Sequence, residues 1–131
     1  MKPDELLYAK THEWVHLSEA NGETTATIGI SDFAIQQLTD LVYIELPEVG
    51  RAVKAGESFG EIESVKAVSD LYSPVTGEIV EVNDRLKDSL ELFSDDPYGA
   101  GWVMKVRVTD PASTQNLSDY TAYQAQCAAD H

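Results

Sequence analysis

Residues 61–82 constrain the fold more than any other part of the sequence. Apolar and β-branched residues alternate with polar ones on both sides of Lys66, which is the pattern of two short strands. Pro74 and Gly77 interrupt the second run where a turn is needed. Lys66 is therefore predicted to lie at the tip of a β-hairpin. It is the only Lys or Arg in this segment and is surrounded by carboxylates.

Length and charge limit what the chain can bind. With 131 residues it suits one domain with one core, so we expect residues 1–131 to form a single domain. Its 9 Lys and Arg against 23 Asp and Glu give a formal net charge of −14. That charge repels nucleic-acid backbones and anionic membranes, so neither is an expected partner, whereas basic patches of other proteins are. We expect a monomer.

Compartment and redox chemistry follow from what the sequence contains. Cys127 is the only cysteine, so an internal disulfide is excluded and a structural role near the C-terminus is expected. The first residues show neither the apolar core of a secretory signal nor an Arg-rich transit peptide, and no segment approaches membrane-spanning length. We expect a cytoplasmic protein.

Most of the remaining pattern predicts short strands. Strands are expected at residues 6–8, 12–17, 24–30, 41–46 and 102–108, with residues 84–101 forming a surface loop. Asn21-Gly22 predicts a tight hairpin turn. Ser31 is expected to cap a short helix near residues 31–38, and Thr121 with Gln124 to form a capping box in a C-terminal helical segment.

A weak internal repeat bears on how these strands assemble. Residues 48–54 resemble residues 81–87, and Gly50 of the first copy aligns with Asn83 of the second. Both residue types tolerate positive φ, so both are expected to turn the chain in the same way. Two similar units with the lysine hairpin at their junction predict a mainly β fold, a flattened barrel or sandwich of short strands. Chance similarity in a turn-rich β domain is the alternative.

Other constellations give no catalytic centre. His12 and His16 have a zinc-like spacing, but on a strand they would lie roughly 13 Å apart, too far to share an ion. The acidic clusters lack the pattern of a calcium loop, and no nucleophile elbow or phosphate-binding glycine loop occurs. We therefore expect neither a metal site nor catalytic residues.

Lys66 remains the candidate functional residue. An exposed lysine on a turn is usually only a solubilising charge, and without desolvation its pKa of ~10.4 makes it a poor nucleophile. The same exposure favours acylation by another enzyme. Residues 63–70, Glu-Ser-Val-Lys-Ala-Val-Ser-Asp, closely resemble the lipoylation site of the glycine cleavage system H-protein family.

The resemblance extends from Leu6 to about Asp130. Its further motifs lie at residues 12–14, 40–50, 73–80, 96–102 and 121–123. Leu90 and Ser94 depart from the pattern, because the family more often has Pro and Asn there. The resemblance implies a lipoyl-domain-like barrel-sandwich hybrid in which Lys66 carries lipoate in amide linkage, with Glu63 contributing to recognition by the lipoylating enzyme.

A non-catalytic shuttle role is implied as well. In such a family the lipoyl-lysine side chain, called the arm, accepts an aminomethyl group from a pyridoxal-phosphate glycine decarboxylase. It passes this group to a tetrahydrofolate-dependent aminomethyltransferase. A dihydrolipoyl dehydrogenase then reoxidises the arm. The alternatives are a lipoate relay donor to 2-oxoacid dehydrogenases and an unmodified acidic adaptor. Biotin is disfavoured, because Val65 and Ala67 flank the lysine where biotin carriers usually have methionines.

Overall fold

A computed structural model describes residues 2–129 of the chain and consists mainly of antiparallel strands. The strands are β1 (Leu7–Tyr8), β2 (Glu13–Ala20), β3 (Glu23–Ile30), β4 (Leu41–Glu45), β5 (Ala52–Val53), β6 (Ser58–Ser64), β7 (Val68–Tyr72), β8 (Thr76–Val82) and β9 (Met104–Asp110). The α-helices are α1 (Asp32–Leu38), α2 (Leu92–Asp95) and α3 (Tyr120–Ala129), and the 3-10 helices are η1 (Pro3–Glu5), η2 (Asp84–Lys87) and η3 (Pro111–Asn116).

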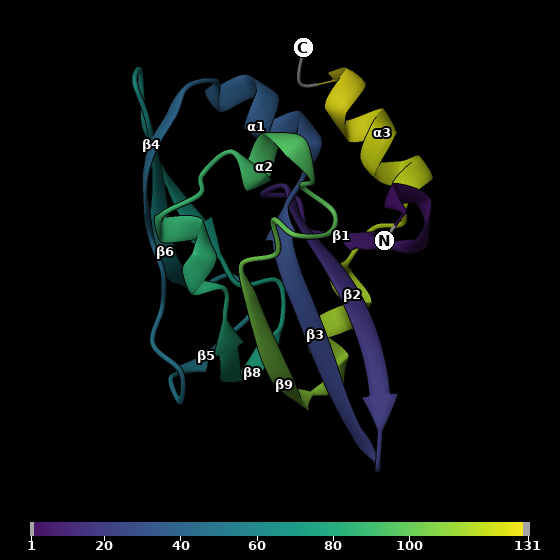
Figure 1. Ribbon diagram of the computed structural model, residues 1–131. Coiled ribbons are helices and arrows are strands. Elements are labelled where there is room, and N and C mark those ends of the chain that lie inside the picture. Colours follow the sequence, from purple (N-terminus) through teal and green to yellow (C-terminus); the bar gives the residue numbers. More distant parts are fainter. Residues whose placement is uncertain (1, 130–131) are drawn as a thin grey trace.

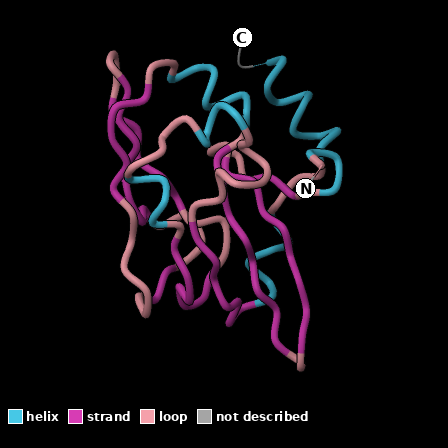
Figure 2. Tube along the Cα trace, viewed as in Figure 1, coloured by secondary structure: helices cyan, strands magenta, loops and turns pink. Residues whose placement is uncertain are grey.

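Two sheets enclose the main core and do not close into a barrel. One has six strands in the order β1-β2-β3-β9-β8-β5, and the other has three in the order β4-β6-β7. Buried aliphatic residues from both sheets, among them Ile28, Ile62 and Ile79, form one cluster between them. Figure 1 shows the smaller sheet at the left, and Figure 2 shows α1, α2 and α3 gathered at one end of the strands. The expected mainly β fold with helices near residues 31–38 and at the C-terminal end is confirmed.

Local signals in the sequence correctly placed the β2–β3 turn and α1. Asn21 and Gly22 have φ values of 55° and 79° and connect Ala20 to its partner Glu23, as a two-residue hairpin turn requires. Ser31 is the N-cap of α1, where its hydroxyl accepts a hydrogen bond from the backbone N–H of Ala34 at 3.3 Å.

The predicted capping box at Thr121 is wrong. The carboxylate of Asp119 accepts a hydrogen bond from the Ala122 backbone N–H at 2.9 Å, and α3 begins at Tyr120. Thr121 therefore lies inside the first turn, where its hydroxyl cannot cap the helix. An aspartate two positions earlier supplies a charged acceptor at the same helix end.

Asn83 also departs from its predicted conformation. Its φ is −92°, whereas Gly50 has a φ of 95°, so the two residues do not turn the chain alike. The Asn83 side-chain amide instead donates to the carbonyls of Ala100 and Trp102 at 2.9 and 2.8 Å. These bonds hold Ala100 and Trp102 outside the last strand, which begins at Met104 and not at the predicted residue 102. The predicted loop at residues 84–101 contains the short helices η2 and α2.

The turn between α1 and β4 contains a strained residue. Thr39 has φ 57° and ψ −149°, a conformation that glycine adopts freely and that costs a β-branched residue roughly 1–3 kcal/mol. Its exposed hydroxyl bonds only the neighbouring Leu38 carbonyl, at 2.7 Å. We expect Thr39→Gly to raise the free energy of unfolding by about 1 kcal/mol, because relief of strain exceeds the added entropy of the unfolded chain. Urea unfolding measures this change, and a less stable variant would contradict it.

Candidate functional site

The predicted hairpin tip is confirmed, with Lys66 in the turn between β6 and β7. The Ser64 backbone N–H donates to the Ala67 carbonyl at 2.8 Å, and the Ser64 hydroxyl accepts from the Ala67 N–H at 3.1 Å. A third bond joins the Val65 N–H to the Asp40 carbonyl at 3.0 Å. Main-chain and serine contacts thus fix the turn without using the lysine side chain. The tip projects at the upper left of Figure 1, beyond β4 and β6.

The surface around the tip is exposed and partly apolar. Lys66 is exposed, and within residues 2–129 its amine has no ion-pair partner. Val65 and Val68 beside it are 73% and 59% exposed. Glu63 on β6 is half-buried and pairs in register with Val68 on β7. A free primary amine is therefore presented on a rigid mount, with one carboxylate three positions before it.

A pocket of about 380 Å³ lies between the start of β2, α1 and β7. Its lining includes Glu13, which is only 2% exposed, and Asp70 from the lysine hairpin. The Thr11 hydroxyl and the Tyr72 backbone N–H donate to the Glu13 carboxylate, the latter at 3.4 Å. Burial outweighs these bonds and raises the pKa of Glu13 to about 7. Glu13 can therefore gain or lose a proton close to neutral pH.

A smaller buried cluster that includes Tyr8, Trp14 and Tyr123 contacts the residues that precede β2 and α1, next to that pocket. The buried Tyr123 of α3 places its hydroxyl 2.7 Å from Nδ1 of His12 and 2.6 Å from the hydroxyl of Ser31. Its ring stacks on Tyr8 with a centroid separation of 4.3 Å. Burial raises the pKa of Tyr123 well above its ordinary value, so the phenol stays protonated. These contacts join α3 to the residues that begin β2 and α1.

Comparison with known proteins now identifies the family. The family model described as glycine cleavage H-protein matches residues 6–130. A curated glycine cleavage system H protein from Rhodopirellula baltica is 54% identical over 126 residues, covering 96% of this chain and 95% of that protein. One from Gloeothece citriformis is 61% identical over 109 residues, covering 83% and 80%.

A solved structure agrees with the sequence comparisons. The crystal structure of a glycine cleavage system H protein from Mycobacterium marinum superposes with a TM-score of 0.86 at 41% identity, covering 95% of this chain and 98% of that one. The chain belongs to the glycine cleavage H-protein family. As a member of the H-protein family it is a lipoyl-carrying shuttle of the glycine cleavage system and a non-catalytic carrier, not an enzyme.

The sequence did not predict the roles of two residues of this H-protein family member. Glu13, which lines the pocket beside β7, and Tyr123, which contacts His12 and Ser31, lie within the matched motifs at residues 12–14 and 121–123 but had no predicted role there. The one local signal for Glu13 is a carboxylate placed directly before Trp14 and Val15 in a strand that buries both. A strand of this kind seldom carries a charge inward, so an acidic residue there marks a site with a special environment.

His12 and His16 lie in different settings. His12 directly precedes β2 with a φ of 79° and contacts Tyr123, whereas His16 lies within β2. In residues 2–129 no group of three or more His, Cys, Asp or Glu side chains is arranged to hold a metal ion. Over the same residues, no helix is long and apolar enough to cross a membrane. Cys127 is a free, half-buried residue of α3.

Proposed function

We propose that Lys66 carries the lipoyl group of this shuttle through an amide bond to Nζ. The observation that carries the proposal is an exposed lysine, without an ion-pair partner among residues 2–129, on a turn whose geometry depends on Ser64 and Ala67 rather than on the lysine itself. The residues present fit the group, because the amine is accessible and its acylation removes no structural contact. When bound, lipoate supplies a dithiolane that exchanges between disulfide and dithiol states.

The partners follow from that role. We propose that the arm visits a pyridoxal-phosphate glycine decarboxylase, a tetrahydrofolate-dependent aminomethyltransferase and a dihydrolipoyl dehydrogenase, after a lipoylating enzyme has loaded Lys66. The hairpin fixes where the flexible stem begins, and the net charge of −14 favours rapid, reversible encounters with basic surfaces. We further propose that residues 1–131 act as one carrier domain, which the shared core of the two sheets supports, and that this domain is monomeric and cytoplasmic.

The pocket beside β7 gives the chain a place to hold a cationic group carried on the arm. Asp70 lies on β7, four positions after Lys66 along the chain and beyond the turn that carries the attachment point. Glu13 would lose its proton as an ammonium group enters, and its carboxylate would then pair with that cation. Both carboxylates line the pocket, and a cation between them would be partly shielded from water.

Mass spectrometry of the protein from its native host tests the attachment. We expect one added lipoyl group on the intact chain, mapped to the peptide that contains Lys66. An unmodified Lys66 in cells that make lipoate would instead favour an acidic adaptor that carries no cofactor. A lipoyl group on another lysine would keep the carrier function and reject the assigned residue.

Recognition by the lipoylating enzyme is expected to involve Glu63. Glu63→Gln removes a charge that lies beside the hairpin tip, and we expect kcat/KM for lipoylation of the unmodified protein to fall about tenfold, the size of one contact at an interface. Glu61→Gln is the matched control, because Glu61 lies on the same strand two positions farther from Lys66. Equal losses in both variants would mean that Glu63 has no specific role.

A further inference from the structure

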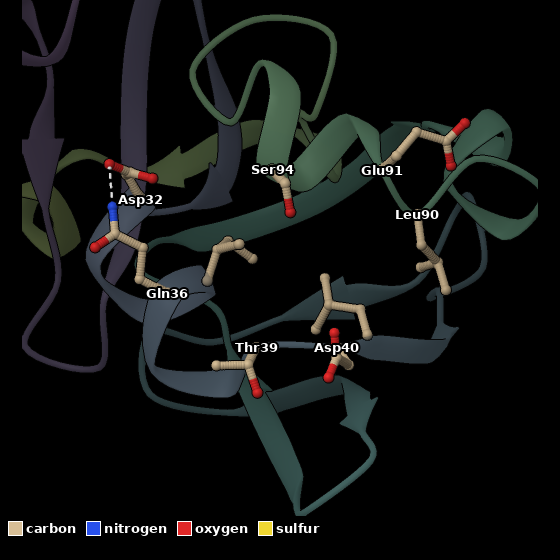
Figure 3. Close-up of a pocket in the computed structure, with 9 residues that line it drawn as sticks. Asp32, Gln36, Thr39, Asp40, Leu90, Glu91 and Ser94 are labelled. Carbon is tan, nitrogen blue, oxygen red and sulfur yellow. Dashed lines mark hydrogen bonds between the residues drawn. The ribbon is translucent and has the colours of Figure 1, made fainter.

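A second hollow lies on the other side of the hairpin, between α1, residues 39–41 and the α2 region. Its volume is about 690 Å³, and Ile35, Leu41 and Leu90 give it an apolar lining. Figure 3 shows Asp32 and Gln36 at the left, Leu90 at the right and Ser94 above, with Thr39 and Asp40 below the space between them. We call this hollow the α1–α2 cleft.

The charges of the α1–α2 cleft are all negative. Asp32, Asp40 and Glu91 line it, and no Lys, Arg or His does. Within residues 2–129 none of these three carboxylates has a Lys or Arg partner, and the Asp32 carboxylate accepts a hydrogen bond from the Gln36 side-chain amide at 2.9 Å. In Figure 3 the Glu91 carboxylate points outward from the rim. An apolar lining with carboxylates around it matches a Lys or Arg side chain, whose methylenes pack while its charge pairs.

The α1–α2 cleft is linked directly to the lysine hairpin. Asp40 lines the cleft with its side chain, while its backbone carbonyl accepts the hydrogen bond from Val65, the residue before Lys66. Val42, which follows the cleft residue Leu41, is 54% exposed. An enzyme that acylates the bare amine must bring its active site within one lysine side chain of this turn. Its surface would then lie next to Val65 and to Asp40, which borders the cleft.

We propose that the α1–α2 cleft receives a basic side chain of the enzyme that attaches lipoate to Lys66. The inference rests on the proposed function of Lys66. It adds a docking contact in the cleft, which Asp40 separates from the turn that carries the acylated amine. The contact forms between whole proteins before chemistry begins. It therefore lowers KM for the carrier protein and leaves kcat unchanged.

Steady-state lipoylation tests the contact. The unmodified full-length protein is incubated with lipoate, MgATP and a purified lipoate–protein ligase, and product is followed by intact mass. The test variant Asp40→Asn/Glu91→Gln removes two cleft charges and keeps the Asp40 carbonyl. The control Glu19→Gln/Glu23→Gln removes two charges from the β2–β3 hairpin, at the opposite end in Figure 1. We expect KM to rise about tenfold in the test variant and less than twofold in the control, with kcat retained.

Each outcome separates the two proposals. Equal KM values in both variants would show that only the net charge of the protein matters. A fall in kcat alone would show that the substitutions affect the acylation step and not binding. Either result overturns the docking contact. Thermal unfolding of both variants identifies any loss of fold. If the wild type is modified at Lys66 and the cleft variant matches it, only the docking inference fails. If the wild type gains no lipoyl group at Lys66, the proposed attachment fails and the docking inference falls with it.

Discussion

Lys66→Arg is expected to leave the protein folded and to abolish lipoyl loading completely. The guanidinium keeps the charge of the side chain but does not form the lipoyl amide. The turn itself depends on Ser64, Ala67 and the Asp40–Val65 bond, none of which involves the replaced side chain. Intact mass after incubation with lipoate and ligase should therefore show no addition, and the unfolding midpoint should match that of the wild type.

A matched lysine provides the control for that variant. Lys54 is also exposed, but it lies in the turn before β6, away from the β6–β7 tip. Lys54→Arg is expected to be loaded normally and to support glycine-dependent release of carbon dioxide in the reconstituted system. Lipoyl loading or glycine cleavage that persists in Lys66→Arg would reject Lys66 as the attachment residue.

Glu13→Gln is expected to flatten the pH dependence of stability. The pKa of Glu13 is about 7 in the folded protein, against an ordinary value of 4.5. Between these values the unfolded chain binds fewer protons than the folded one, so the free energy of unfolding falls as the pH rises. The total loss is about 3 kcal/mol, complete above pH 7 and absent below pH 4.5. A glutamine at this position does not titrate and still offers an oxygen to Thr11 or Tyr72.

Urea unfolding from pH 4 to 8 measures this effect as the difference between wild type and variant, which removes the contribution of the other carboxylates. The variant should be more stable than the wild type at pH 8 and nearly equal to it at pH 4. Glu19→Gln, at an exposed position, should follow the wild-type profile. A constant difference between wild type and Glu13→Gln across the range would mean that Glu13 does not titrate with a raised pKa.

Features decided by neighbouring residues could be predicted from the sequence. The Asn21-Gly22 turn requires two positive φ values, the Ser31 cap requires one hydroxyl before α1, and the Lys66 hairpin requires alternating strands around a short turn. Each depends on contacts within a few residues. The local pattern therefore carried enough information to place Lys66 in the turn of a β-hairpin.

Features that depend on distant partners could not be predicted in this way. Asn83 was expected to turn the chain, but its amide is used by carbonyls 17 and 19 positions later. The environment of Glu13 requires β7, and the hydroxyl of Tyr123 reaches back 111 positions to His12. The pocket beside β7 and the α1–α2 cleft are each assembled from segments that are distant in sequence. The sequence shows the charged residues that line them, but it does not show which of these residues lie together.

The strand order also determines which sheet can form first as the chain emerges from the ribosome. The three strands around the lysine hairpin come from residues 41–72, so that sheet can pair while the rest of the chain is still being made. In the larger sheet, β9 lies between β3 and β8. Its two halves therefore stay separate until residues 104–110 emerge, and the closing contacts are non-local and slow. A nascent chain can thus present its lysine hairpin before the scaffold beneath it is complete.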